Sequence, residues 1–386
     1  MGTAPSSPSS NGALGEVVRL FLKVGVIGFG GPAAHIAMMR DEVVRRRRWI
    51  ADARFLDLLG MTNLIPGPNS TEMAIHLGYV RAGWPGLVLG GACFILPAML
   101  SVLVLAWAYV TYGARPEAAA LLYGIKPVII AVVMQAAWAL TRTAVKGPLL
   151  ALVGIVTVAL SLLRVHELVL LLGAGVTVVM ARGMGRRHAS PFVLLVTSIT
   201  VPATGGVAAA VSLTTLALTF LKIGAVLYGS GYVLLAFLRR DFVERLGWLS
   251  DRQLLDAVAI GQFTPGPVFT TATFIGYVLG GWTGGLLATL AIFVPSFVFV
   301  ALSQPFVPKI RASPAAGAFL DGVNVAALAL MVTVTWELAR AAIVDAPTAL
   351  LAAGAAVALI VFRVNSAWLV VGGAAVGVAA MLIARA

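Results

Sequence analysis

Charged residues are scarce in this chain. Aspartate, glutamate, lysine and arginine make up 11% of its 386 residues, and hydrophobic residues make up 60%. A water-soluble domain has roughly a quarter charged residues, so a soluble protein of this size is excluded. The single cysteine, Cys93, excludes an internal disulfide and a cysteine-based zinc site. The Gly-x-x-x-x-Gly-Lys and His-Glu-x-x-His motifs are absent, so we expect no enzyme activity, no cofactor and no bound metal.

Long apolar runs fill most of the sequence. A helix needs about 20 mainly apolar residues to cross a bilayer. The net charge is +12. The basic residues lie between these runs, as the positive-inside rule predicts, rather than on a nucleic-acid-binding surface. We therefore expect a multi-pass protein of a bacterial inner membrane, surrounded by lipid. Both a monomer and a homodimer are compatible with the sequence. The runs are Gly86–Tyr112, Ala118–Leu140, Pro148–Leu163, Leu168–Ala181, Leu286–Leu302, Ala315–Ala339, Thr348–Phe362 and Ala367–Ala384.

The chain contains an internal repeat. Phe21-Leu22-Lys23-Val24-Gly25 recurs 199 residues later as Phe220-Leu221-Lys222-Ile223-Gly224, and Pro66-Gly67-Pro68 recurs at the same offset as Pro265-Gly266-Pro267. After one deletion the offset becomes 198, and six of the eight tryptophans fall into repeat pairs. Such repeats are typical of secondary transporters, whose substrate site lies between the repeats. We predict a tail at 1–12, repeats at 13–188 and 213–386, and a linker at 189–212.

Each half is predicted to be entirely helical. A glycine-rich helix (Val17–Met39 or Ala217–Leu238) precedes a charged stretch, two short pieces around Pro-Gly-Pro and four apolar helices. The pieces Phe55–Ile65 and Asn69–Tyr79 have 11 residues each, about 16 Å of helix, and cannot span alone. A re-entrant hairpin gives five crossings per half and inverted halves, whereas one broken crossing helix gives six and parallel halves. Counts of basic residues do not separate these topologies.

The two Pro-Gly-Pro segments must break a helix, because proline lacks an amide hydrogen and glycine allows a turn. Matching breaks in two halves point to a transport site. A helix that begins after such a break presents unpaired amides and a positive dipole end, which favour a tetrahedral oxyanion. Shaping of the bundle alone is the alternative. The candidate binding residues here are Asn63, Pro66, Gly67, Pro68, Asn69, Ser70 and Thr71, and Gln262, Thr264, Pro265, Gly266, Pro267, Thr270 and Thr271.

Charged residues inside the apolar segments are further candidates, because intramembrane charges are costly and usually functional. Lys23 and Lys222 are repeat-paired and could bind the anion, or could extend to an interface. Lys126 is a weaker candidate, because its repeat counterpart is Asn324.

Among the acids, Glu72 follows the first break and has no acidic counterpart. It could couple transport to a proton, or could form a capping box with Asn69. Asp57 and Asp256 are repeat-paired and could also take part in proton coupling.

The motifs together resemble the chromate ion transporter family in its long, two-domain form. They are Phe21-x-Lys-x-Gly with Phe29-Gly-Gly-Pro32 and Pro66-Gly-Pro68, repeated as Phe220-x-Lys-x-Gly, Tyr228-Gly-Ser-Gly231 and Pro265-Gly-Pro267. The resemblance implies inverted halves and export of chromate that confers chromate resistance, with sulfate as the chemical analogue. It also assigns binding roles to Lys23, Gly30 and Gly31 and to the second-half positions Lys222 and Gly229. A sulfate carrier and an anion channel are the alternatives.

Overall fold

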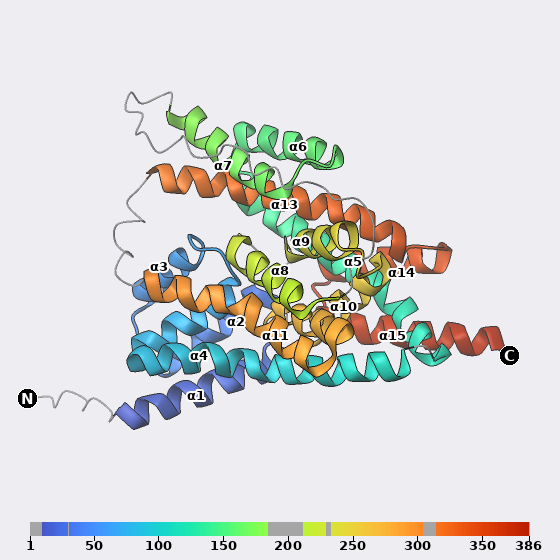
Figure 1. The fold of residues 1–386 in the computed structure, drawn as a ribbon, viewed down its shortest axis with the longest axis horizontal. Coiled ribbons are helices and arrows are strands. Elements are labelled where there is room, and N and C mark those ends of the chain that lie inside the picture. The colour runs from blue at the N-terminus through green and yellow to red at the C-terminus, as the bar shows by residue number, and fades with distance from the viewer. Residues whose placement is uncertain are drawn as a thin grey trace, which may run out of the picture.

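The computed structural model describes residues 10–29, 31–113, 115–183, 211–228, 233–303 and 314–385. Most of the predicted tail and linker lies outside these ranges. Every regular element within them is a helix, which confirms an all-α membrane protein (Figure 1). The first half contains α1 (Ser10–Ile27), α2 (Gly31–Arg40), η1 (Asp41–Arg46), α3 (Asp52–Thr62), α4 (Asn69–Tyr112), α5 (Pro116–Ala144), α6 (Pro148–Leu162) and α7 (Glu167–Gly183).

The second half repeats this order. It contains α8 (Leu213–Val226), α9 (Leu234–Leu238), η3 (Arg239–Arg245), α10 (Asp251–Phe263), η4 (Val268–Thr270), α11 (Thr271–Ser303), α13 (Pro314–Ala342), α14 (Ala346–Ile360) and α15 (Ser366–Arg385). Each element follows its first-half counterpart at the offset that the sequence repeat predicts. Five helices of the described residues are long and apolar enough to cross a membrane by length and composition.

The glycine-rich segment at the start of each half is a helical hairpin, not the single helix predicted over Val17–Met39. The chain leaves helical geometry between α1 and α2, and Lys23 and Glu42 then meet at 2.6 Å. Residues 19 positions apart can meet only if α2 and η1 turn back along α1, because a continuous helix would separate them by about 28 Å. The second half makes the same turn, with Lys222 2.7 Å from Asp241.

A second hairpin, formed by α3 and the first segment of α4, has the Pro-Gly-Pro break at its turn. The helix α4 consists of two segments that reverse at Ala82 and Gly83, where the backbone is not helical. A Cβ atom on Gly78 would lie 2.1 Å from the carbonyl oxygen of Gly86, so the two segments pack with their backbones in contact. Small residues allow this approach, which side chains would block. The same reversal occurs in α11 at Gly280 and Gly281.

The hairpin of α1 and α2 and the hairpin of α3 and the first segment of α4 both start and finish at one end of the molecule. This end is here called the arginine end because it holds Arg45–Arg48. The side chain of Arg81, at the α4 reversal, lies 2.7 Å from Glu16 near the start of α1. Its guanidinium also lies 5.3 Å from the ring of Trp49, which follows η1. The breaks between α1 and α2 and between α3 and α4 therefore lie at depth, between the arginine end and the opposite end, called the far end.

Equivalent helices of the two halves run antiparallel, so the halves have opposite orientations. Along α4 and α11, Gly91 faces Phe297 and Leu103 faces Gly285. Along α5 and α13, a residue shortly beyond the end of each helix contacts a residue in the first half of the other helix. Lys146 lies 2.7 Å from Asp321, and Tyr123 donates a hydrogen bond of 2.7 Å to Asp345.

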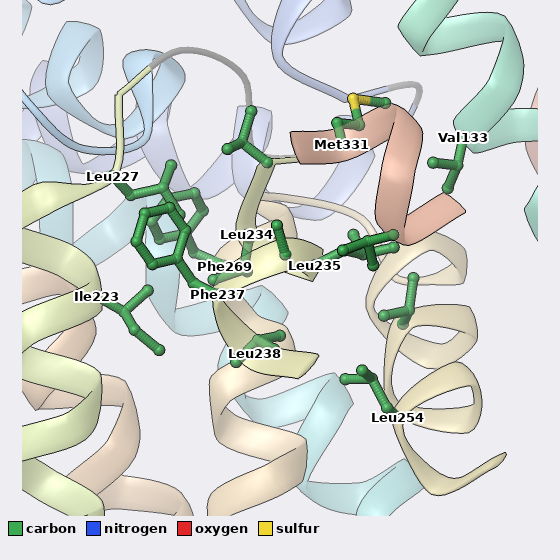
Figure 2. Packing of buried hydrophobic residues seen from close by; sticks show 14 of the residues in the cluster. Val133, Ile223, Leu227, Leu234, Leu235, Phe237, Leu238, Leu254, Phe269 and Met331 are labelled. Carbon is green, nitrogen blue, oxygen red and sulfur yellow. The ribbon is translucent and has the colours of Figure 1, made fainter. Parts of the chain in front are cut away.

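The halves are also interlocked. Helix α5 packs against α14 and α15 of the second half, and α13 packs against α6 and α7 of the first. Glycines permit the closest crossing, since a Cβ on Gly124 would lie 1.9 Å from the carbonyl oxygen of Gly373. Figure 2 shows the large apolar core, in which Leu235 and Phe237 of α9 share a cluster with Val133 of α5 and Met331 of α13.

Candidate functional site

The four helix breaks are joined in two pairs across the boundary between the halves. The amide of Gly67 donates a hydrogen bond of 2.8 Å to the carbonyl oxygen of Leu227, at the end of α8. The amide of Gly266 donates an equivalent bond of 2.8 Å to Gly28, at the end of α1. Each Pro-Gly-Pro corner is thus joined to the first break of the opposite half. Each corner therefore has a partner of its own across the interface between the halves.

The first corner requires glycine. Gly67 has φ +141°, and a Cβ atom there would lie 2.3 Å from Glu72 Oε1 and 2.6 Å from Ser296 Oγ. After Pro68, the amides of Thr71 and Glu72 donate to the carbonyl oxygen of Pro68. The amides of Asn69 and Ser70 make no hydrogen bond to the described residues. The start of α4 therefore keeps two donors and the positive dipole end for an anion.

The second corner is also a glycine turn, but its hydroxyls are engaged locally. Gly266 has φ +96°, and a Cβ there would lie 2.7 Å from the Cβ of Ala98. Ala98 and Ser296 occupy equivalent positions in the two halves, so one corner meets a methyl group and the other a hydroxyl. Thr270 donates to the carbonyl oxygen of Pro267, and Thr271 to that of Val268. The two corners therefore offer different groups to a ligand.

Glu72 is fully buried beside the first corner, and neither of its carboxyl oxygens has a hydrogen-bond partner among the described residues. Ser296 Oγ and Thr71 Oγ1 are likewise buried and unpartnered. The capping-box interpretation of Asn69 and Glu72 is wrong, because no side chain caps α4 at Pro68. Buried polar groups without partners are costly, so this cluster of oxygens is a place where a ligand or a proton would supply the missing bonds.

Several of the other predicted residues near the breaks form local hydrogen bonds. Asn69 donates to Asn63 at 2.6 Å, and Thr264 donates to the carbonyl oxygen of Ile260. Gln262 has an unpartnered, buried Nε2 atom. Gly31 begins α2 with φ +76°, which identifies the Gly-Gly-Pro segment as a break rather than a helix interior. Gly30 and Gly229 lie outside the described residues.

The repeat-paired lysines both form ion pairs. Lys23 pairs with Glu42 and Lys222 pairs with Asp241. The two ammonium-bearing side chains remain 47% and 34% exposed, while their carboxylate partners are 11% and 2% exposed. The lysines therefore have structural partners that sequence reasoning did not identify, because the fold-back of α2 onto α1 was not foreseen. Their role in substrate binding stays a prediction.

Asp256 takes part in a buried triad with a lysine that the sequence ranked lower. Lys126 Nζ lies 2.9 Å from Asp256 Oδ1, and both side chains are less than a tenth exposed. Tyr109 donates a hydrogen bond of 2.9 Å to Asp256 Oδ2. The triad joins α4 and α5 of the first half to α10 of the second. Asp57, at the equivalent position of α3, is only half-buried.

An apolar groove of about 540 Å³ runs beside the second corner. Its lining carries no charged residue and includes Phe29, Leu100, Ser101, Val104, Leu105, Phe263, Thr264 and Pro265. Among the described residues, no three histidine, cysteine, aspartate or glutamate side chains converge as a metal site would require. The chemistry of the breaks is therefore that of amides, hydroxyls and one carboxyl group.

Comparison with known proteins agrees with the repeat. Residues 15–179 and 214–378 each match the chromate transporter family. The chain is 36% identical to a chromate transport protein of Cupriavidus metallidurans, over 94% of this chain and 92% of that protein. It is 34% identical to a probable chromate transport protein of Synechococcus elongatus, over 88% of both chains. The uncharacterized transporter YwrA of Bacillus subtilis is 27% identical over 40% of this chain and 89% of its own length. No solved structure matches the chain.

Proposed function

This chain belongs to the chromate transporter family, and we propose that it exports chromate across a bacterial inner membrane and so confers resistance to chromate. Relatives over most of its length are named chromate transport proteins. The membrane potential, negative inside, favours outward movement of an anion. A secondary carrier therefore needs no ATP-binding subunit for this direction.

The proposal is supported chiefly by the pairing of each Pro-Gly-Pro corner with a helix break of the inverted half. Irregular backbone at membrane depth is tolerated where it lines a site, and helix starts aimed at such a site favour anions. The free amides of Asn69 and Ser70 and the hydroxyls of Thr71 and Ser296 are the donors at the first corner. Chromate is a tetrahedral dianion with four acceptor oxygens, which suits a cluster of donors without a metal.

Glu72 is the group that we propose couples transport to a proton. An ionised carboxylate within about 4 Å of a dianion would repel it by several kcal/mol, even at an effective dielectric constant of about 20. A protonated Glu72 would instead donate a hydrogen bond to the anion. The titratable groups close to it are His76, one turn further along α4, and Tyr228, which interacts electrostatically with the carboxyl group. Asp57 and Asp256 are further candidates for coupling.

Two alternatives remain distinct in their expected behaviour. Sulfate and chromate share charge and shape, so a carrier of one is expected to bind the other. A sulfate carrier would be distinguished by its preference for sulfate when both anions are present. An anion channel would pass current without exchange of one anion for another. The family and the names of the relatives favour chromate over both.

Chromate flux into proteoliposomes tests the proposal. We expect saturable uptake of chromate, inhibition by excess sulfate, and acceleration by chromate loaded on the opposite side. Cells that express the protein should accumulate less chromate than cells without it, at several sulfate concentrations. Flux of sulfate but not chromate, or current without countertransport, would contradict the proposal.

A further inference from the structure

The two inverted halves of this structure are packed differently at the arginine end and at the far end. Helix α10 packs against α5, α13 and α15 in addition to its own α11, whereas the only extensive packing of α3 among the described residues is against α4. Leu255 on α10 is 1% exposed, and its equivalent Leu56 on α3 is 46% exposed. The unit at the far end is thus packed more tightly around α10 than the unit at the arginine end is around α3.

The hydrophobic clusters also differ between the two halves. Buried apolar residues of α1–α3 and the first part of α4 form a cluster of their own, which includes Val17, Phe55 and Phe94. The equivalents in α8–α11, among them Leu216, Leu254 and Ile292, belong to the large cluster with α5, α7 and α13. The second-half unit therefore shares its apolar core with α5, α7 and α13, whereas the first-half unit has a core of its own.

The Lys126–Asp256–Tyr109 triad lies where the second-half unit meets the long helices. Tyr109 is three residues from the end of α4, which places the triad toward the far end. The pair is 2.9 Å apart and excluded from solvent, so separation of its charges would leave both in a medium of low dielectric constant. On α13 the position equivalent to Lys126 holds Asn324, so that helix carries no lysine at this place.

We propose that Lys126, Asp256 and Tyr109 form a lock that holds the far end of the transport path closed, and that this structure is the state open at the arginine end. In an inverted repeat, exchange of the two packings between the halves closes one end and opens the other. The opposite state would dock α3 on α13 as α10 now docks on α5. With Asn324 in place of a lysine, that state lacks an equivalent ion pair, so the lock biases the resting protein toward the observed state.

This inference rests on the proposed carrier function, but its test needs no chromate. In full-length protein with Cys93→Ala, single cysteines at Leu56→Cys and Leu255→Cys report the two ends. A membrane-impermeant maleimide is added to open membrane fragments, where both faces are accessible. We expect Leu56→Cys to react roughly tenfold faster than Leu255→Cys, because labelling rates follow the population of the open form.

Two substitutions should move the equilibrium in the same direction. Lys126→Gln removes the lock, and Asn324→Lys places a lysine at the equivalent position of α13, where α3 would dock in the opposite state. Each should raise the labelling rate of Leu255→Cys roughly tenfold and lower that of Leu56→Cys. Lys146→Gln, which removes an exposed ion pair just beyond α5, is the matched control and should change neither rate.

Misfolding is separated from gating by the exchanged pair Lys126→Asp with Asp256→Lys, which restores opposite charges and should restore protection of Leu255→Cys. The proposal is overturned by equal labelling of the two cysteines in the unaltered background. It is also overturned if neither Lys126→Gln nor Asn324→Lys changes the rates. Failure of chromate flux with the expected labelling would count against the substrate and not against the lock.

Discussion

The amide of Gly67 donates a hydrogen bond of 2.8 Å to the carbonyl oxygen of Leu227, which belongs to the opposite half of the chain. The reciprocal bond joins Gly266 to Gly28. Because both bonds cross the boundary between the halves, any relative movement of the halves must alter the geometry of both corners. The corners are thus mechanically part of the interface as well as the proposed place where the anion binds.

Gly67→Val and Gly266→Val are each expected to abolish chromate flux, to less than about a hundredth of the wild-type rate. Both glycines have positive φ angles that valine rarely adopts, and the added Cβ would lie 2.3 Å from Glu72 Oε1 or 2.7 Å from the Cβ of Ala98. Flux into proteoliposomes and membrane abundance are the measurements. Gly60→Ala is the control, since no atom lies within 4 Å of its added Cβ. Wild-type flux in both valine variants would refute the role of the corners.

Glu72→Gln is expected to retain chromate flux and to lose its dependence on pH. Glutamine keeps the shape and neutrality of a protonated carboxyl group, so it removes only the step in which a proton must arrive. Wild-type flux should fall roughly tenfold more than that of the variant between about pH 6 and pH 8. Because chromate itself titrates in this range, only the difference between the two proteins is informative. Superimposable pH profiles would exclude Glu72 as the coupling group.

The sequence repeat predicts which residues are equivalent, but not how the breaks are paired. The Pro-Gly-Pro corners were recognisable because proline and glycine act on their own backbone, so the break at Pro66–Pro68 needs no knowledge of the rest of the fold. The turn between α1 and α2 was missed, although Gly28, Gly31 and Pro32 carry a similar signal. Glycines within an apolar run are equally consistent with close packing of an unbroken helix. The ion pair between Lys23 and Glu42 and the positive φ angle of Gly31 distinguish the two in the structure.

Lys222→Met is expected to destabilise the protein more than Lys23→Met. Asp241 is 2% exposed and keeps only Arg245 as a described ion-pair partner, whereas Glu42 is 11% exposed and keeps both Arg46 and Arg47. The expected losses are about 1–2 kcal/mol for Lys222→Met and less than about 1 kcal/mol for Lys23→Met, after allowance for solvent at the exposed ammonium groups. Thermal unfolding in detergent measures the difference, and the opposite order would contradict the assignment.

Acid should weaken the contact between α5 and the loop before α14. The hydrogen bond from the Tyr123 hydroxyl, followed by those from Thr348, holds the pKa of the Asp345 carboxyl below its ordinary value. A carboxyl with a lowered pKa in the folded state contributes stability above its unfolded pKa, and the contribution is lost as the pH falls through the folded pKa. Asp345→Asn should therefore flatten the decline of melting temperature below about pH 4. An unchanged acid decline would show that Asp345 does not contribute.

The triad of Lys126, Asp256 and Tyr109 illustrates what the sequence could not reveal. Lys126 lies 130 residues from Asp256, and no local pattern links an apolar helix of one half to a short helix of the other. The sequence shows the mismatch of Lys126 with Asn324, which by itself argues against a binding role. In the structure the same mismatch distinguishes the closed end from the open one, because buried charges depend on partners that only the tertiary fold supplies.

Direct binding of radiolabelled chromate to the purified protein tests the central claim, that an oxyanion is held at the paired helix breaks between the halves. The account predicts saturable binding that excess sulfate displaces, that Gly67→Val abolishes and that Gly60→Ala leaves intact. Binding of equal affinity in Gly67→Val and wild-type protein would place the anion elsewhere and contradict the account.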